Sequence, residues 1–298
     1  MEDGAEMLCY PPSSIVYPQT SIPTSAYCPL PAFPIILSRP MLILLTNDDG
    51  IHAPGLLALY RALKTLGDVR VVAPETVQSA AGHGITLSTP ILTSEVRIGE
   101  DFVGTAVNGR PADCVKLAVS KLLPRQPDLV VSGMNSGANV GINVIYSGTV
   151  AAAIEGAFLG VPSIAVSLYL RQEIPIDYAR SCGFARQAID QLLAAGLSGG
   201  QCATINVPPL HPHENPAGIK VVRQCTRGWT DEYDQRQDPR GRHYFWNSSV
   251  FKLGETEEDT DVAALREGYI TVTPLQFDLT HYAMLRAWEG REWGLGKR

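Results

Sequence analysis

Apolar positions along this chain are grouped in short runs that alternate with helical stretches. Runs of Val, Ile and Leu without polar interruption are typical of strands buried on both faces, and helices between them are typical of parallel crossovers. The pattern therefore predicts an α/β fold with a doubly wound, mostly parallel, Rossmann-like sheet. The alternating segments are MLILLT (41–46), APGLLALYRALKTLG (53–67), DVRVVAP (68–74), DLVVSG (128–133), GTVAAAIEGAFLG (148–160) and VPSIAVSL (161–168).

The same reading extends toward the C-terminus. Residues 172–195 predict a further helix, and CATINV (202–207) predicts a further strand. After a long interruption, EGYITVTPL (267–275) predicts a strand and residues 280–290 predict a terminal helix. The chain contains no internal repeat.

Residues 211–255 differ in composition from the core segments. They are rich in Pro, Gly, Arg, Asp and aromatic residues, and TRGWTDEYDQRQDPRGRHYFW is typical of an extended hairpin around the turn signal DPRG. Such a hairpin would leave apolar surface in water unless a second subunit covers it. We interpret the segment as an oligomerisation arm and expect a homodimer or a homotetramer. The aromatic residues concerned are Trp229, Tyr233, Tyr244, Phe245 and Trp246.

The first forty residues form a separate, Pro-rich segment. They hold three acidic residues, one Arg and no Lys, and Pro recurs at eight positions, so neither helical nor strand periodicity develops. A secretory signal would need a basic start and an unbroken apolar stretch, which this segment lacks. We expect residues 1–40 to be a disordered or loosely docked extension and residues 41–298 to be the functional domain.

Composition narrows the functional class. The chain has 298 residues, 45% of them hydrophobic, and a formal charge of −6 with scattered Lys and Arg, which disfavours binding to a nucleic acid duplex. No run of 18 apolar residues is present, so the sequence predicts no membrane span. The six Cys residues form no C-x-x-C pair, which disfavours zinc and disulfide frameworks and favours the cytoplasm.

Two adjacent carboxylates end the first predicted strand. TNDDG (46–50) places Asp48 and Asp49 at the carboxyl end of MLILLT, where open α/β sheets bind ligands. Neighbouring carboxylates repel each other unless a cation lies between them, and hard divalent cations prefer carboxylate oxygens. The alternative is a turn in which one Asp caps the following helix and the other is solvated, and the motif alone leaves both interpretations open.

Two later loops should meet the same edge of the sheet. The loop after DVRVVAP carries Ser79 and Gly82, and neutral oxygens of this kind can complete a metal site without adding charge. The loop after DLVVSG is Gly-rich and runs into a helix near Thr149, where backbone N–H groups can bind phosphate. This second loop supplies Asn135, Asn139, Asn143, Ser147 and Thr149.

Other phosphate and metal motifs are missing from the sequence. Neither the P-loop pattern GxxxxGK[ST] nor GxGxxG after a strand occurs, which argues against a Walker-type NTPase and a dinucleotide oxidoreductase. His52 and His83 lie near the loops, but no H-E-x-x-H pair accompanies them, so they do not predict zinc.

The motifs together resemble the SurE family of survival-protein nucleotidases. The resemblance runs from about residue 41 to 285 and implies a divalent-metal-dependent phosphomonoesterase that hydrolyses nucleoside 5′- and 3′-monophosphates, with short-chain polyphosphate as a further substrate. The segments that carry it are ILLTNDDGIHAPG, VVAPETVQSAAGHGITL, NGRPADCVKLA, PDLVVSGMNSGANVG, VIYSGTVAAAIEGAFLGVPSIAVSL, DPRGRHYFW and EGYITVTPLQFDLT.

The resemblance also implies a set of site residues. Asp48, Asp49, Ser79 and Asn135 would hold one divalent cation per subunit, Mg²⁺ or Mn²⁺, and Asp48 and Asp49 would be catalytic. The sequence departs from the family at FDLTHYAML, where His281 follows Asp278 by three residues rather than by four as in relatives that read DLTAH. Residues implied to surround the cation or to contact phosphate and substrate are Asn47, Gly82, Asn139, Ser147, Gly148 and Thr149.

Two other functions use the same sequence features. A nucleotide-binding regulator without turnover would use the same metal and phosphate pocket, and loss of a metal ligand would mark it. A structural protein would depend on the arm at 211–255, with no metal-stimulated phosphate release. All four implied ligands are present, which favours the enzyme acting on a nucleoside monophosphate.

Overall fold

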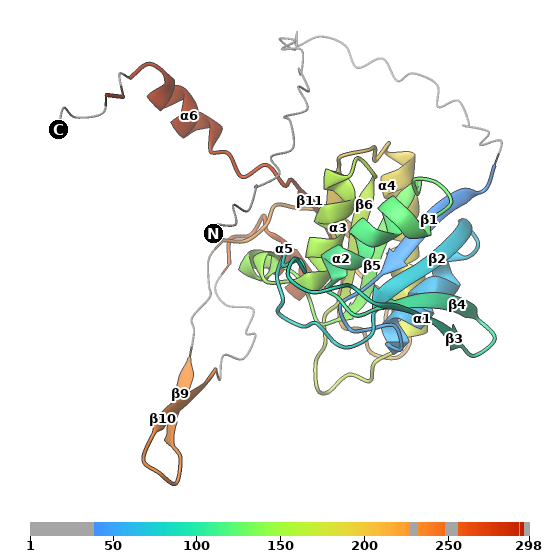
Figure 1. Cartoon of the computed structure of the whole chain (residues 1–298), viewed down its shortest axis with the longest axis horizontal. Coiled ribbons are helices and arrows are strands. Elements are labelled where there is room, and N and C mark those ends of the chain that lie inside the picture. Colours follow the sequence, from blue (N-terminus) through green and yellow to red (C-terminus); the bar gives the residue numbers. More distant parts are fainter. Residues whose placement is uncertain (1–38, 227–231, 248–255, 292, 295–298) are drawn as a thin grey trace, which may run out of the picture. The chain divides into compact units, whose positions relative to one another are not determined.

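The computed structural model describes residues 39–226, 232–247, 256–291 and 293–294 (Figure 1). The predicted extension therefore lies outside the described residues, apart from Arg39 and Pro40. The elements are β1 (Met41–Thr46), α1 (Pro54–Leu63), β2 (Gly67–Pro74), β3 (Thr93–Ile98), β4 (Phe102–Val107), α2 (Pro111–Leu117), η1 (Ala118–Leu122), β5 (Leu129–Ser136), η2 (Gly141–Ile145), α3 (Gly148–Phe158), β6 (Ser163–Leu168), α4 (Tyr178–Ala194), β7 (Cys202–Val207), β8 (Ile219–Val221), β9 (Tyr233–Gln237), β10 (His243–Asn247), α5 (Asp261–Arg266), β11 (Ile270–Leu275) and α6 (Tyr282–Glu289).

Nine strands form one sheet in the order β3-β4-β2-β1-β5-β6-β7-β11-β8. The central strands pair in parallel, and only the β3–β4 and β7–β11 pairs are antiparallel. The chain order reverses between β1 and β5, because β2 extends the sheet on one side of β1 and β5 on the other. This arrangement confirms the predicted doubly wound α/β fold.

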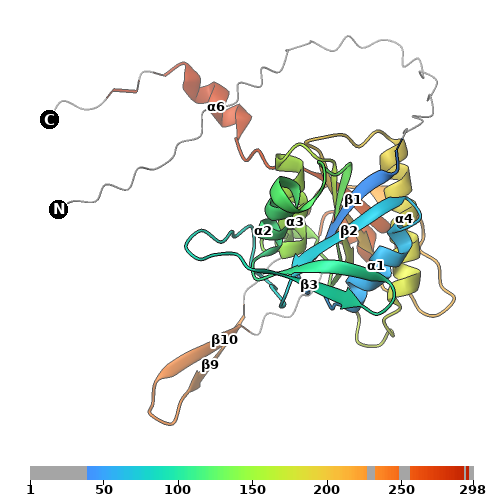
Figure 2. The same ribbon diagram turned by 45° about the vertical axis from the view of Figure 1, so that its right-hand side comes forward.

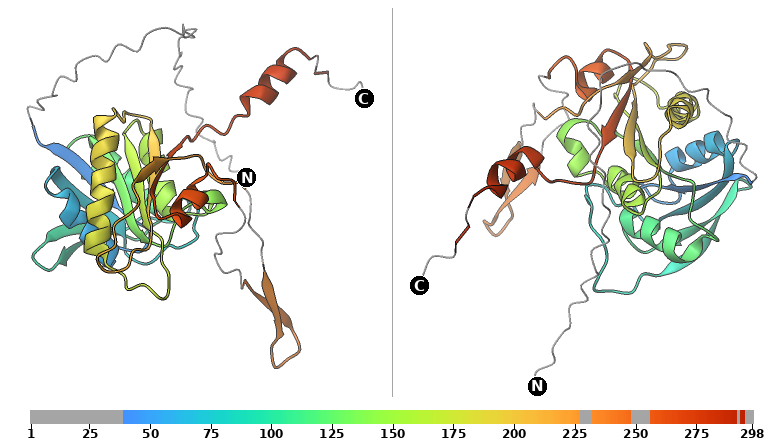
Figure 3. Two further views of the ribbon diagram at one scale, coloured as in Figure 1. Left: turned by 180° about the vertical axis from the view of Figure 1, so that it is seen from behind. Right: turned by 90° about the horizontal axis from the view of Figure 1, so that it is seen from above.

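Helices cover both faces of this sheet, which explains the uninterrupted apolar strands. Successive side chains of a strand point to opposite faces, so Ile43 and Leu45 pack with α1 and α4 while Leu44 packs with α2 and α3. All three side chains are fully buried. The view from above shows α1 and α4 on one face and α2 and α3 on the other (Figure 3).

The pair β3–β4 at one edge of the sheet was not predicted from the sequence (Figure 2). Thr93–Ile98 is exposed at most positions, so it lacks the apolar run that marked the central strands. The predicted helix at 172–195 is α4, which begins at Tyr178 after Asp177 caps it by accepting the backbone N–H of Arg180 at 3.0 Å. The predicted terminal helix is α6.

The predicted hairpin is present as the antiparallel pair β9–β10. Its turn is closed by Asp238, whose carboxylate accepts the backbone N–H groups of Arg240 and Arg242 at 2.8 and 2.9 Å. The links at 227–231 and 248–255 lie outside the described residues. Within the described ranges, no helix is long and apolar enough to span a membrane.

Candidate metal and phosphate site

A cavity of about 520 Å³ lies at the carboxyl ends of β1 and β5, where the chain order of the sheet reverses. This is the crevice in which open α/β sheets bind ligands. Asn47, Gly82, Gly148 and Thr149 lie near it without lining it. Seven of the residues singled out in the sequence line the cavity: Asp48, Asp49, Ser79, Asn135, Asn139, Asn143 and Ser147.

Asp48 is the buried carboxylate of the site. It lies two residues after the end of β1 and is only 5% exposed, and its Oδ1 accepts a hydrogen bond from the Thr149 hydroxyl in the first turn of α3. Burial raises the pKa of Asp48 to about 6; hydrogen bonds from Thr149 oppose this shift, and the charge of Asp49 adds to it. An ionised Asp48 is therefore costly without a positive charge beside it, and a cation would relieve that cost.

Gly148 allows α3 to begin against this carboxylate. A Cβ at Gly148 would lie 2.8 Å from the Cβ of Asp48, 3.1 Å from its Oδ2 and 3.2 Å from Cγ of Pro111. Only a residue without a side chain fits there. The Ser147 hydroxyl caps the helix by accepting the backbone N–H of Val150 at 3.1 Å, so the positive end of α3 faces Asp48.

Asp49 and Asn135 come from neighbouring strand ends. The Asp49 carboxylate accepts the backbone N–H of Ser136, the last residue of β5, at 3.1 Å, which ties the two strand ends together. The Nδ2 of Asn135 donates to the carbonyl of Gly137 at 2.7 Å, so the amide oxygen of Asn135 remains as a further oxygen donor.

Ser79 lies on the loop between β2 and β3, and backbone bonds fix this loop beside the site. The N–H of Gln78 donates to the carbonyl of Asp48 at 2.7 Å, and the N–H of Gly82 donates to the carbonyl of Tyr146 at 3.0 Å. The Gly82 amide is thus engaged with protein, and Ser79 is the exposed hydroxyl between these two anchors.

The other implied residues support the loops of the site. The Nδ2 of Asn139 donates to the Ser167 hydroxyl at 2.8 Å, and its backbone N–H donates to Oδ1 of Asn206 at the same distance. These bonds hold the Gly-rich loop against β6 and β7. Asn47 is fully buried, donates to the carbonyl of Gly50 at 2.9 Å and keeps a buried Oδ1 with no hydrogen-bond partner.

This donor set fits a hard divalent cation. Among the residues described, no Lys, Arg or His forms an ion pair with Asp48 or Asp49, and no cluster of three His, Cys, Asp or Glu side chains occurs. Ser79 and Asn135 line the same cavity as the two carboxylates, so their neutral oxygens are available to complete a ligand set. Carboxylate, hydroxyl and amide oxygens are the ligands that Mg²⁺ and Mn²⁺ prefer.

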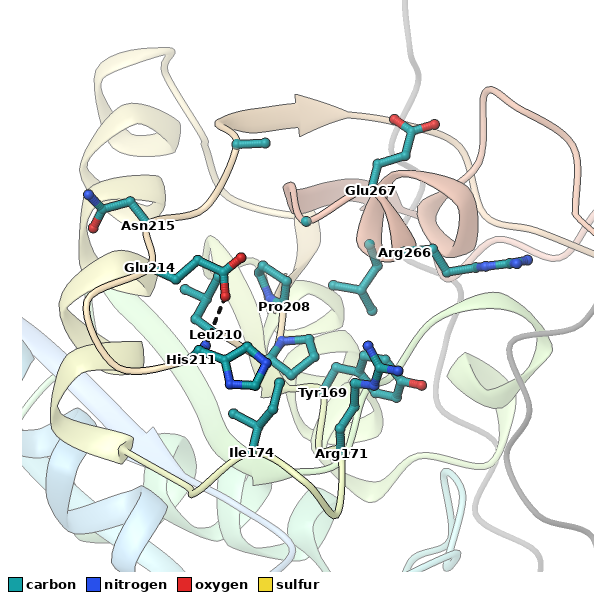
Figure 4. Close-up of a pocket in the computed structure, with 14 residues that line it drawn as sticks. Tyr169, Arg171, Ile174, Pro208, Leu210, His211, Glu214, Asn215, Arg266 and Glu267 are labelled. Carbon is teal, nitrogen blue, oxygen red and sulfur yellow. Dashed lines mark hydrogen bonds between the residues drawn. The ribbon is translucent and has the colours of Figure 1, made fainter.

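Two tyrosines of the cavity wall were not predicted. Tyr146 precedes the cap of α3, and Tyr169 directly follows β6, so its place after a parallel strand is the sequence signal that could have found it. Tyr169 also lines a second cavity of about 590 Å³, around which Arg171 and His211 are arranged (Figure 4).

His281 lies outside the cavity that holds the two carboxylates. Its Nδ1 accepts the backbone N–H of Met284 at 3.1 Å, so it caps α6. With Asp278 and His83 it lines a different cavity, of about 770 Å³, that reaches the site at Ser147. In the structure His281 thus serves as the N-cap of α6.

Comparison with known proteins agrees with this geometry. The family model described as Survival protein SurE matches residues 43–231. Proteins named 5′-nucleotidase SurE from Syntrophobacter fumaroxidans and Heliobacterium modesticaldum are 48% and 46% identical to the chain, covering 82% and 83% of it and 97% and 90% of their own lengths. A solved structure of the SurE protein from Aquifex aeolicus superposes with a TM-score of 0.72 at 38% identity, covering 83% of this chain and 98% of its own. This chain therefore belongs to the SurE family.

Proposed function

We propose that the protein is a divalent-metal-dependent nucleotidase that hydrolyses nucleoside 5′- and 3′-monophosphates to nucleoside and phosphate. The observation that carries the proposal is the buried carboxylate of Asp48, which lies next to Asp49 in the sequence and accepts a hydrogen bond from Thr149 in the first turn of α3. A cation-binding pair and an anion-binding helix end in one cavity are what a metal-assisted phosphate site needs. The names of the SurE relatives support the same activity.

Asp48, Asp49, Ser79 and Asn135 would hold the cation, with Mg²⁺ or Mn²⁺ as the candidates. Such a cation supplies a Lewis acid for phosphoryl oxygens and lowers the pKa of water. Asp49, held by the Ser136 N–H, or Asp48 would orient a water near phosphorus. The first backbone N–H groups of α3 provide fixed dipoles toward a phosphoryl anion.

The nucleoside has room beside this phosphate position. A cavity of about 520 Å³ lies within the range of about 300–1,000 Å³ found for small-molecule sites. Tyr146 and Tyr169 are the aromatic side chains of its wall, and an aromatic ring offers a surface on which a base can stack.

A regulator that binds nucleotides without turnover is not favoured. Its mark would be loss of a metal ligand, whereas all four candidate ligands line one cavity. Phosphate release from a panel of nucleoside 5′- and 3′-monophosphates, a non-nucleotide phosphomonoester and short polyphosphate tests the proposal. We expect metal-stimulated release that is fastest with the nucleotides; nucleotide binding without release would support the regulator.

The affinity for the cation should depend on pH through the ionisation of Asp48. Its pKa of about 6 means that below pH 6 a proton competes with the cation, so apparent metal affinity should fall by up to about tenfold per pH unit on the acid side. Calorimetric titration of the metal-free protein with Mn²⁺ between pH 5 and 8 measures this. Affinity that stays constant down to pH 5 would contradict the role given to Asp48.

We propose that the chain works as a homodimer or homotetramer. On the β9–β10 arm, Tyr233, Phe245 and Trp246 are 59–60% exposed in the single chain, and the apolar side chains of α6 are exposed as well. Covering them with a second copy removes apolar surface from water. Sedimentation should give a dimer or larger species at micromolar concentration, and a monomer would count against the arm as an interface.

We propose that residues 41–298 carry the activity. They include β1 and every candidate ligand. Deleting residues 1–40 should leave kcat/KM for a nucleoside monophosphate within about threefold, or about 0.65 kcal/mol of transition-state stabilisation. A truncated protein that is insoluble, or that loses about tenfold or more, would show that the segment belongs to the functional domain.

The cytoplasm is the proposed location. Cys114, Cys182 and Cys202 are free and buried in the described part of the chain. Burial raises the pKa of Cys182 and of Cys202 to about 12, so both stay as unreactive thiols. Unpaired, inert cysteines are typical of a reducing compartment.

A further inference from the structure

The loop between β2 and β3, residues 75–92, is held by two buried carboxylates from the helices on one face of the sheet. One is Glu155 on α3 and the other is Asp113 on α2. This loop also carries Ser79, the one candidate cation ligand that is not next to a strand end. Its exposed position means that Ser79 depends on the anchors around it.

Glu155 joins the loop to both helices. It is 5% exposed, its Oε2 lies 2.8 Å from Nε2 of His83 in the loop, and its Oε1 lies 3.2 Å from Nζ of Lys116 on α2. Burial alone would raise the pKa of Glu155, but hydrogen bonds from His83 and Lys116 outweigh burial and lower it. Glu155 therefore remains a carboxylate, and its charge is matched by these two partners.

Asp113 fixes the loop at Thr86, three residues after His83. Its carboxylate accepts the Thr86 backbone N–H at 3.0 Å, the Thr86 hydroxyl at 2.7 Å and the Arg110 backbone N–H at 2.9 Å. Thr86 is thus held in place without Glu155. The side-chain anchor nearest to Ser79 on its C-terminal side is the bond between His83 and Glu155.

The segment between Ser79 and His83 has a backbone that needs such support. Ala80 has a φ of 55°, a left-handed conformation that residues with a Cβ rarely adopt, and Gly82 has a φ of 54°. Unfavourable backbone conformations persist where the surroundings hold both ends. Gln78 supplies the N-terminal anchor through the carbonyl of Asp48. At the C-terminal end, the Gly82 N–H donates to the carbonyl of Tyr146, and His83 adds the side-chain anchor.

We propose that Glu155 is a positioning residue for the cation site, acting through His83 to hold Ser79 toward Asp48 and Asp49. This inference rests on the proposed function, because it takes Ser79 to be a cation ligand. Partners that orient metal ligands commonly change metal affinity by about 10–100-fold when they are removed. Glu155 should therefore affect cation binding although it does not line the cavity with the two carboxylates.

The test is Mn²⁺ binding to the metal-free full-length protein, measured by titration calorimetry. Glu155→Gln keeps the shape and removes the charge, and should weaken Mn²⁺ binding by about tenfold. In a Ser79→Ala background the same substitution should cause no further loss, because the ligand that it positions is gone. An equal loss in both backgrounds, or no loss in either, would overturn the inference.

His83→Ala covers the case in which Glu155→Gln fails to fold. His83 is an exposed residue, and its removal leaves Glu155 paired with Lys116. It should reproduce the loss of Mn²⁺ affinity and its dependence on Ser79, and unchanged affinity would contradict the proposal. A general loss of stability would instead weaken binding in both backgrounds.

Asp128→Asn is the matched control. This carboxylate accepts the Leu42 backbone N–H at 2.8 Å and pairs with Arg125 at 2.7 Å, at the amino end of β1 and β5. Its removal should lower the melting temperature without changing Mn²⁺ affinity. Wild-type protein that binds no Mn²⁺ would refute the cation site of the proposed function itself, which is a different outcome from an inert Glu155→Gln.

Discussion

Replacing Asp48 by Asn should lower kcat/KM for a nucleoside monophosphate by at least about a thousandfold, or about 4 kcal/mol. The amide keeps the shape and can still accept the Thr149 hydroxyl, but it removes the buried charge that would hold the cation. Steady-state phosphate release at saturating Mn²⁺ measures the loss. Activity near that of the wild type would show that the site is assigned wrongly.

The same substitution should not weaken the metal-free fold. Because the pKa of Asp48 is raised from 3.8 to about 6 in the folded protein, its ionisation costs stability in full above pH 6, and this cost shrinks as pH falls from 6 toward the unfolded pKa. The neutral amide of the Asp48→Asn variant would carry no such cost. In chelator at pH 7.5, this variant should therefore unfold at the same or a higher temperature than the wild type, and the difference should shrink at pH 5.

Replacing Gly148 by Ala should also remove most of the activity, by about a hundredfold or more. The new Cβ would lie 2.8 Å from the Cβ of Asp48 and 3.2 Å from Pro111, so either the carboxylate or the start of α3 must shift. Displacements near 1 Å at a catalytic group can cost about a hundredfold in rate, and overpacking costs about 1–3 kcal/mol in stability. Kinetics and thermal unfolding of the variant measure the two effects.

Gly183→Ala provides the control for Gly148→Ala. Gly183 lies within α4, and a Cβ there would meet nothing within 4 Å. Ala should stabilise the helix by about 0.5–1 kcal/mol and leave kcat/KM unchanged. Equal activity losses in both variants would mean that the effect at Gly148 does not come from contact with Asp48.

The central sheet and the place of the site could be predicted from the sequence. Strands buried on both faces need uninterrupted apolar runs such as residues 41–46, and helices between such runs dictate parallel pairing. Parallel strands bring their carboxyl ends to one edge of the sheet, so Asp48 and Asn135 line the same cavity. For the same reason Asp49 bonds to Ser136, although 87 residues separate them in the sequence. The role of each individual residue at that edge is implied only by the resemblance to the family.

The remaining features depend on contacts that local sequence does not encode. The exposed strand β3 has no apolar run, so its pairing with β4 could not be predicted from the sequence. The contact of Gly148 with Asp48 and the bond between Glu155 and His83 join distant segments, and a Gly at a helix start or a Glu on a helix is ordinary in any sequence. Only the packed structure gives these residues a role.

The most direct test of the account is phosphate release from a nucleoside 5′-monophosphate by protein stripped of metal with a chelator. We expect no release from the stripped protein, recovery when Mg²⁺ or Mn²⁺ is added back, and no recovery in Asp48→Asn, because the buried carboxylate is what would hold the cation. Release that continues undiminished in chelator, or that Mn²⁺ restores equally in wild type and Asp48→Asn, would contradict a metal-dependent nucleotidase centred on Asp48.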